Sequence, residues 1–430
     1  MPTATPKPST AKPTTPTEAP AATTDDTGEP SNEIPPYVAA QMDIIQEEVI
    51  ELRGLSPNQP VDRALLTPEQ LRKRVIEDFL AEYTPEEAQE DVAVLAAFGL
   101  LEPGFDLLHM YQELFSEQVA GFYDNETKEM YVVQDEAFEG TQRMTYAHEY
   151  THVLQDQTYD FENGLGYDEE ACEEDSERCA AIQSLIEGDA TLAELHWFQK
   201  YSTDEDKQQV MEFYGSYESP VYDNAPEFLK QDFLFPYQNG LLFVQALYDD
   251  GGWEAVDAAY DNLPLSTEQI LHPEKYPADV PVQVTLPDLS DALGSGWEEI
   301  DRGVMGEWYT YLILGHGADE DARLDTGDAE DAAAGWSGDS YVVYANGENS
   351  AVAMAFRSLW ETEGDATEFI EAFQAYATAR FGEPLVNESG HLAWQDASGY
   401  HDLYYAGLQT TWMLAPDAGT AQAIWAAVKP

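Results

Sequence analysis

The chain has 430 residues, of which 83 are acidic and 19 basic, giving a formal net charge of −64. Nucleic-acid binding needs patches of lysine and arginine, so this balance excludes nucleic acid and disfavours anionic lipid as partners. The hydrophobic content of 43% is enough for a sizeable core, and no run of 18 apolar residues predicts a transmembrane segment. The charge predicts a solvated acidic surface, with a surface for cations or basic substrates as the alternative.

Residues 1–36 are rich in Thr, Pro and Ala, a composition that predicts a disordered, extended tether because it cannot bury a core. Spacers of this kind often follow a removed export signal or a lipidated cysteine. We therefore expect an extracellular or cell-surface protein, tethered through its N-terminus and monomeric. In a secreted chain, the two cysteines, Cys172 and Cys179, predict a local disulfide, with a zinc half-site as the alternative.

Helical patterns dominate residues 37–300. The first helix begins near Pro36, and Thr67 and Thr84 each begin another with a proline at the first position and a capping-box pattern. A polar turn between two extended runs predicts a β-hairpin at residues 120–135. Hydrophobic periodicity predicts further helices at 105–119, 141–157, 180–201 and 235–252, whereas 271–289 is proline-rich and mostly extended.

The pattern changes after a short helix at 302–315 and an acidic stretch, 316–332, that we interpret as a loop. Asn346-Gly347 predicts the turn of a second hairpin. A helix at 365–382, strands at 391–396, 400–406 and 409–415, and a final helix at 418–428 complete a β-β-α-β-β-β-α module. The predicted fold class is α+β, with a mainly helical domain and small sheet at 37–300 and an α+β module at 301–430.

One stretch, TYAHEYTHVLQDQ at residues 145–157, carries two of the chain's 8 histidines. Helical residues four apart share a face, so His148 and His152 present two imidazoles to one point, and Glu149 projects beside it. Two neutral imidazoles with an adjacent carboxylate suit Zn²⁺, with Glu149 as the base that takes a proton from zinc-bound water. The alternative is a pair of structural histidines on an amphipathic helix.

A catalytic zinc site normally has a third protein ligand. We expect Glu187 in SLIEGDATLAEL, because a carboxylate buried in an apolar helical segment without a partner would be costly. An exposed glutamate is the alternative interpretation, and Glu194, one heptad further along, is the alternative ligand. Asp156, four residues after His152, is placed to accept the other ring N–H of a ligand histidine.

Several motifs together resemble a group of uncharacterised exported bacterial proteins with the features of gluzincin-type zinc metallopeptidases. They are GFYDNETKEMYVV, HEYTHVLQDQ, EGDATL, FPYQNGLLFV and STEQILHPEKY, and the resemblance spans about residues 37–430. It implies a zincin-like domain at 37–300 whose ligands are His148, His152 and Glu187 and whose base is Glu149. It also implies that the hairpin strand before the HEYTH helix is an edge strand that pairs with extended peptide.

One position departs from the pattern of the class. An aspartate commonly follows the ligand glutamate by four residues, and here that position is Thr191. Asp189 or Asp156 is therefore expected to support the ligands instead.

Hydrolysis also needs a donor for the negative oxygen of the tetrahedral intermediate. Tyr237 in PYQNG is the first candidate, because it is expected to open the helix after that of Glu187 and resembles a Tyr-x-x-Gly element of several gluzincins. His272 and Tyr276 in HPEKY are the alternatives, on an extended segment expected to line the same cleft. An ordinary half-buried tyrosine is the other interpretation of Tyr237.

The sequence thus predicts a secreted or surface-tethered zinc metallopeptidase that cleaves peptide or protein substrates. A non-catalytic zinc-containing binding protein on the same scaffold is one alternative. A zinc hydrolase of non-peptide amides is another.

Overall fold

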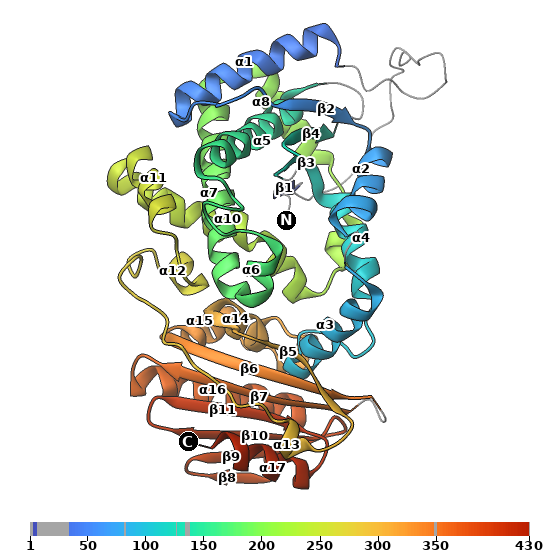
Figure 1. Ribbon diagram of the computed structural model, residues 1–430, viewed down its shortest axis with the longest axis vertical. Coiled ribbons are helices and arrows are strands. Elements are labelled where there is room, and N and C mark those ends of the chain that lie inside the picture. The colour runs from blue at the N-terminus through green and yellow to red at the C-terminus, as the bar shows by residue number, and fades with distance from the viewer. Residues whose placement is uncertain are drawn as a thin grey trace.

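A computed structural model describes residues 3–6, 34–80, 83–125, 127–133, 138–347 and 351–429. Its fold is α+β, as predicted, with helices around a small sheet in one half and a large antiparallel sheet in the other (Figure 1). Within these described residues, no helix combines the length and apolar character needed to span a bilayer.

The N-terminal half is mainly helical. Two of its helices, α2 and α3, begin at the predicted capping boxes of Thr67 and Thr84. A single π-helical turn, Val75–Phe79, extends α2. The helices are α1 (Pro36–Arg53), α2 (Pro68–Arg74), α3 (Pro85–Phe98), α4 (Leu107–Gln118), α5 (Gly140–Tyr159), α6 (Glu169–Glu174), α7 (Ser176–Tyr201), α8 (Asp204–Ser216), α9 (Pro220–Asn224), α10 (Glu227–Gly251), α11 (Trp253–Asp261), α12 (Thr267–Leu271) and α13 (Ser290–Leu293).

The small sheet has the order β1-β3-β4-β2 and lies against α5. The predicted hairpin is confirmed as β3 (Val119–Asp124) and β4 (Glu129–Val133), and β2 (Asp62–Leu66) pairs with β4 in parallel. The strand immediately before α5 is therefore interior, which corrects the expectation of an edge strand there. The outer side of β3 takes β1 (Thr3–Pro6), in antiparallel pairing.

Strand β1 corrects the expectation of disorder for residues 3–6. Pairing along an edge strand uses main-chain N–H and C=O groups, which composition does not reveal. Residues 1–2 and 7–33 of the predicted tether lie outside the described part of the chain.

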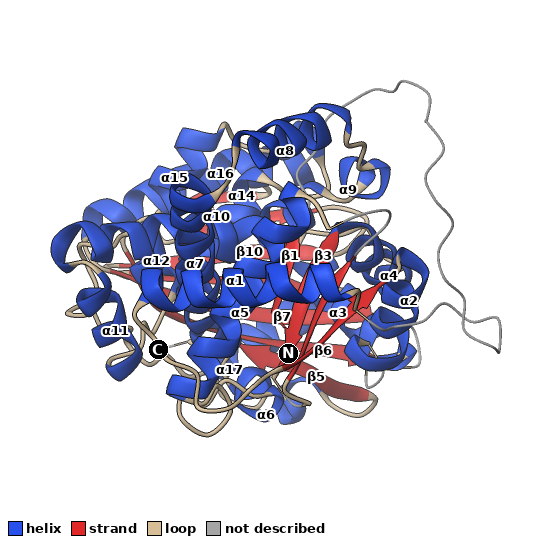
Figure 2. Ribbon diagram, turned by 90° about the horizontal axis from the view of Figure 1, so that it is seen from above, coloured by secondary structure: helices blue, strands red, loops and turns tan. Residues whose placement is uncertain are grey.

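The C-terminal half is a seven-stranded antiparallel sheet of order β5-β6-β7-β11-β10-β9-β8. Helix α16 covers one face and α17 the other, as the view from above also shows (Figure 2). The predicted hairpin, three strands and two helices are confirmed, with β5 and β8 as additions. The elements are β5 (Trp297–Gly303), α14 (Gly306–Gly315), α15 (Thr326–Ala333), β6 (Trp336–Asn346), β7 (Ala351–Trp360), α16 (Glu363–Phe381), β8 (Val386–Glu388), β9 (His391–Gln395), β10 (Tyr400–Ala406), β11 (Gln409–Ala415) and α17 (Ala418–Val428).

Residues 316–332 are not a simple loop, which corrects the prediction for this stretch. They contain a short 3-10 turn, Glu320–Ala322, and most of α15. The buried face of α15 consists of small alanines, such as Ala329, which packs near Gly315 of α14. A face without large apolar residues gives almost no hydrophobic periodicity, so the helix is hidden in the sequence.

The two halves share one continuous core. Phe98, the last residue of α3, lies edge-on to Tyr341, Phe356 and Trp412 of the large sheet, with ring centroids 5.4 to 5.7 Å apart. The expected boundary at 300/301 falls inside β5, which pairs with β6 over residues 297–303. Helices of the N-terminal half and strands of the large sheet thus pack together in one core cluster.

Candidate metal centre

Helix α5 carries the HEYTH motif on its buried side. His148, Glu149 and His152 all have no exposed surface. Strand β3 passes directly over this turn, because a Cβ at Gly121 would lie 3.1 Å from Cγ of Glu149 and 2.7 Å from Cγ2 of Thr145. The glycine therefore permits the close approach of strand and helix that places Glu149 beside the main chain of β3.

Helix α7 brings the predicted third ligand to the two histidines. Nε2 of His148 lies 3.0 Å from Nε2 of His152, and Oε2 of Glu187 lies 3.2 Å and 3.3 Å from these two atoms. A tetrahedral zinc ion with bonds of about 2.0–2.1 Å holds its ligand atoms about 3.3–3.4 Å apart. The three atoms, called here the histidine–carboxylate cluster, therefore form a triangle of nearly the size that one zinc ion requires.

The hydrogen bonds around the cluster indicate which ring nitrogens carry protons. Nδ1 of His148 faces Oε2 of Glu194 at 3.2 Å, and Nδ1 of His152 faces Oε1 of Gln155 at 2.8 Å. Both partners are acceptors, so both Nδ1 atoms donate. The unprotonated Nε2 atoms then point their lone pairs at each other and at Glu187.

Three convergent acceptors repel one another unless a cation lies between them. In addition, Oε1 of Glu187 is buried and accepts no hydrogen bond of normal length from the described residues. Without a metal, a proton on Nε2 of His148 is the cation that relieves this repulsion. Burial lowers the pKa of His148, but the hydrogen bonds of Glu187 and Glu194 outweigh it and raise that pKa to about 10. The donor set, two imidazoles and a carboxylate, fits a divalent metal such as Zn²⁺.

The pKa of Glu187 is shifted in the opposite direction. Burial alone raises its pKa, but the two neighbouring histidines more than compensate and lower it to about 2. The carboxylate is therefore ionised and available as a ligand over the whole physiological range.

Two supporting residues differ from expectation. Asp156 accepts hydrogen bonds from Tyr123 and Lys128, each at 2.7 Å, and contacts neither histidine, which corrects its predicted role. Asp156 does not reach the histidines because its side chain points toward β3 and the hairpin turn. Glu194, the alternative ligand, faces the far nitrogen of His148 and so supports a ligand from behind.

Asp189 belongs to the second layer of contacts, as one of the two predicted substitutes for the aspartate missing at Thr191. Its carboxylate accepts hydrogen bonds from Gln155 at 2.9 Å and Tyr260 at 2.8 Å, and Gln155 in turn holds His152. Sequence reasoning missed Gln155, although its place three residues after His152 on the same helix was a usable signal. It also missed Arg53 and Tyr260, which lie too far away in sequence to be associated with the motif.

Tyr237 lies beside the cluster, but not at the start of a helix as expected. Helix α10 begins earlier, at Glu227, and continues through Pro236. The ring of Tyr237 lies 6.4 Å from that of His148. Burial, followed by the negative charges of Glu187 and Glu149, raises the pKa of Tyr237 well above its usual range, so its hydroxyl keeps its proton.

The close packing of α10 on α7 explains how Tyr237 reaches the cluster. Gly240 and Gly188 lie at the crossing, where a Cβ on either would collide with the backbone of the other helix. The glycine three residues after Tyr237 is therefore needed for helix contact.

The alternative oxyanion donors are engaged elsewhere. Nε2 of His272 lies 2.8 Å from a carboxylate oxygen of Glu307 on α14. The hydroxyl of Tyr276 donates to the main-chain oxygen of Asn262 at 2.6 Å. His272 thus belongs to the contact with α14, and Tyr276 is held by the loop after α11, which favours Tyr237 for the role.

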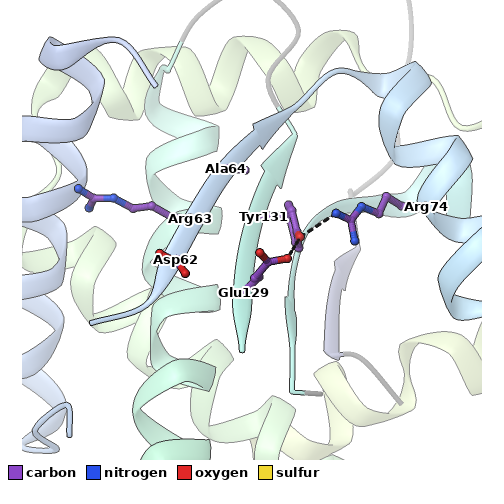
Figure 3. A pocket seen from close by; sticks show the side chains of 6 residues that line it. All are labelled: Asp62, Arg63, Ala64, Arg74, Glu129 and Tyr131. Atoms are coloured by element: carbon purple, nitrogen blue, oxygen red, sulfur yellow. Dashed lines mark hydrogen bonds between the residues drawn. The ribbon is translucent and has the colours of Figure 1, made fainter. Parts of the chain in front are cut away.

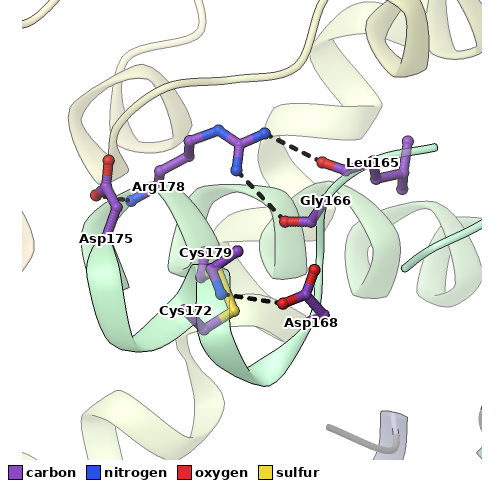
Figure 4. The surroundings of a disulfide bond; sticks show 8 residues. Leu165, Gly166, Asp168, Cys172, Asp175, Arg178 and Cys179 are labelled. Carbon is purple, nitrogen blue, oxygen red and sulfur yellow. Dashed lines mark hydrogen bonds between the residues drawn. A yellow bond between two sulfur atoms is a disulfide. The ribbon is translucent and has the colours of Figure 1, made fainter. Parts of the chain in front are cut away.

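The predicted disulfide is confirmed. Cys172 on α6 and Cys179 on α7 are bonded, and Asp168 and Asp175 cap the N-termini of these two helices (Figure 4). The bridge joins α6 to the start of α7, the helix that carries Glu187.

A surface pocket of about 210 Å³ lies away from the cluster. It opens beside β2 and β4 and is lined by Asp62, Arg63, Ala64, Arg74, Glu129 and Tyr131 (Figure 3). Its two arginines already have partners, because Arg74 donates to Tyr131 and Arg63 pairs with Asp43. None of the cluster residues lines it.

Comparisons with known proteins bear only on the C-terminal half. Residues 294–425 match a family described as a domain of unknown function (DUF8575), a stretch that begins just before β5 and ends within α17. No curated protein matches the chain, and no solved structure matches it.

Proposed function

We propose that the protein is a zinc-dependent metallopeptidase of the gluzincin type. The observation that carries this proposal is the triangle of His148, His152 and Glu187, with three acceptor atoms 3.0 to 3.3 Å apart and the carboxylate of Glu149 on the same turn. When bound there, Zn²⁺ supplies Lewis-acid chemistry, since it polarises a carbonyl oxygen and lowers the pKa of water.

The chain's own side chains supply the remaining functions. Glu149 accepts a proton from the attacking water and then donates it to the leaving amine. Tyr237, kept protonated by its surroundings, donates a hydrogen bond to the oxygen that becomes negative. The outer edge of β3 pairs with an extended segment, β1. We propose that a substrate's main chain pairs at this same edge, next to Glu149.

The proposed setting is outside the cell. A disulfide persists in oxidising compartments, and the high density of carboxylates suits a salty exterior. The proposed substrate is a peptide or protein, and the proposed state is a monomer with an N-terminal tether.

One observation favours a second candidate. The cluster and Glu149 are fully buried, which also suits a zinc ion that stabilises a non-catalytic binding protein. Digestion of a broad peptide library by the wild type and by Glu149→Gln separates the two, with Glu162→Gln, an exposed glutamate, as the matched control.

For a peptidase, Glu149→Gln keeps its zinc and loses roughly 10²–10⁴-fold in turnover, the usual contribution of a general base. Glu162→Gln behaves as wild type. Zinc binding without turnover in the wild type supports the non-catalytic candidate. Cleavage of simple amides but not of peptides redirects the assignment to a non-peptide amidase.

A further inference from the structure

Gln155 is the direct support of His152, and its orientation is fixed by its own contacts. Its Oε1 faces Nδ1 of His152 at 2.8 Å, while its amide nitrogen faces the main-chain oxygen of Ile186 at 3.0 Å, Oδ2 of Asp189 at 2.9 Å and the Tyr260 hydroxyl at 3.0 Å. Because carbonyl and carboxylate oxygens only accept, the amide nitrogen must point toward them. The oxygen is thereby left for the histidine.

Asp189 is in turn held by an arginine from a distant part of the chain. Nε of Arg53 lies 2.7 Å from Oδ1 of Asp189, and Nη2 lies 3.0 Å from Oδ2. Both side chains are fully buried. The guanidinium also contacts Asp257 at 2.7 Å and lies 4.6 Å from the ring centre of Trp253. A two-point contact of this kind fixes the plane of the carboxylate as well as its position.

Arg53 is the last residue of α1, and α1 is docked on α5. Val38, Met42, Ile45 and Val49 of α1 are buried in one core cluster with Tyr146, Tyr150, Val153 and Leu154 of α5. Gly54 then ends α1 in a left-handed conformation, φ 79°. Helix α1 therefore holds the guanidinium of Arg53 in a fixed position behind the histidine–carboxylate cluster.

We propose that Arg53, Asp189 and Gln155 form a positioning relay that fixes the ring and the tautomer of His152, so that helix α1 sets the affinity of the cluster for its metal. The relay rests on the metal centre of the proposed function, but not on peptidase activity. None of its three members contacts the place where a metal or substrate would lie, so they are positioning residues.

The consequence of breaking the relay follows from donors and acceptors. In Asp189→Asn, one carboxylate oxygen becomes an amide NH2 group. Arg53 donates to both oxygen positions, so either orientation of the new amide sets two donors against each other and breaks the two-point contact. Residue 189 is then no longer held in one plane, and the acceptor that it presents to the amide nitrogen of Gln155 is lost or displaced. Gln155 in turn holds Nδ1 of His152 less firmly.

The test is zinc affinity, measured by competition with a chromogenic chelator well below the melting temperature. Loss of an outer support of a metal ligand typically costs 10–100-fold in affinity, and we expect a loss in this range for Asp189→Asn. Asp156→Asn is the matched control. It removes another buried, ion-paired aspartate that follows Gln155 directly but contacts neither histidine. Its zinc affinity should stay within about threefold of wild type.

Arg53→Met should weaken zinc binding as Asp189→Asn does, and Arg53→Lys should restore part of the affinity. If Asp189→Asn does not fold, Gln155→Met makes the same test, because it removes only the acceptor of His152. A folded Asp189→Asn or Gln155→Met variant with wild-type zinc affinity would overturn the relay. A wild type that binds zinc, loses it on Asp189→Asn and cleaves no peptide supports the relay and contradicts the peptidase. A wild type without zinc affinity overturns both.

Discussion

Two clusters of acceptor groups in this molecule differ in whether a positively charged side chain lies among them. In the histidine–carboxylate cluster, three acceptor atoms converge and no lysine or arginine contacts them among the described residues. The other grouping, called here the lysine–carboxylate cluster, contains Glu268, Asp279 and Glu361. There, Nζ of Lys275 lies 2.6 Å from Glu268, 3.1 Å from Glu361 and 3.8 Å from Asp279.

The difference shows why proximity of acidic groups alone does not indicate a metal site. The lysine–carboxylate cluster already contains a cation of the chain's own, and its geometry is that of a salt-bridge network. The histidine–carboxylate cluster consists of atoms that all offer lone pairs, held in place by residues behind them. Only the histidine–carboxylate cluster requires an external cation.

The largest effect is expected from removal of a zinc ligand. His148→Ala, His152→Ala and Glu187→Ala should each weaken zinc binding by more than the roughly 10–100-fold typical of an outer support. Glu361→Ala, which removes a carboxylate from the other cluster, should leave zinc binding unchanged. Elemental analysis after dialysis measures both. Full zinc content in Glu187→Ala would contradict the third ligand and direct attention to Glu194.

A smaller effect is expected from the one hydroxyl beside the histidine–carboxylate cluster. Tyr237→Phe should keep zinc and fold but lower turnover roughly 100-fold or more, because one hydrogen-bond donor to the developing oxyanion is lost. Steady-state kinetics on a cleaved peptide measures it, with His272→Ala as the comparison. An unchanged rate in Tyr237→Phe together with a large loss in His272→Ala would transfer the role to His272.

The smallest expected effect is on the free energy of unfolding. It arises from the lysine–carboxylate cluster and depends on pH. Burial raises the pKa of Glu268 to about 7, although Lys275 opposes this. Since the unfolded value is about 4.3, the folded state holds this proton longer, and the free energy of unfolding falls as pH rises from about 4 to 7. In Lys275→Met that pKa rises further, so the variant should lose about 1–3 kcal/mol at pH 8 and less at pH 5.

Chemical denaturation at both pH values measures this loss, and Lys73→Met, which removes an exposed lysine paired with Glu77, is the control. Added Ca²⁺ should partly restore Lys275→Met, because a divalent ion can replace the missing ammonium among three carboxylates. A pH-independent loss would show that Lys275 acts through packing and not through charge.

Local patterns predicted much of this structure. The spacing of His148 and His152 fixed their shared face, Thr84 fixed a helix start through its capping box, and Asn346-Gly347 fixed a hairpin. In each case the signal and the structure lie within one or two turns of chain. Glu187 could be predicted for a related reason, because a lone carboxylate in an apolar helix needs a nearby partner.

The missed features depend on contacts between distant segments. Nothing near Arg53 indicates that it pairs with Asp189, 136 residues later. Asp156 has the right helical spacing to support a histidine, but Tyr123 and Lys128 of the hairpin hold its carboxylate instead. Tyr237 is expected near the start of a helix at 235–252, whereas α10 begins at Glu227 and continues through Pro236.

Diffraction from wild-type crystals on both sides of the zinc absorption edge tests the account most directly. We predict one anomalous peak, bounded by Nε2 of His148, Nε2 of His152 and the carboxylate of Glu187, and no peak between Glu268, Asp279 and Glu361. A peak only among those three carboxylates, or no peak at the histidines in crystals grown with zinc, would contradict the account.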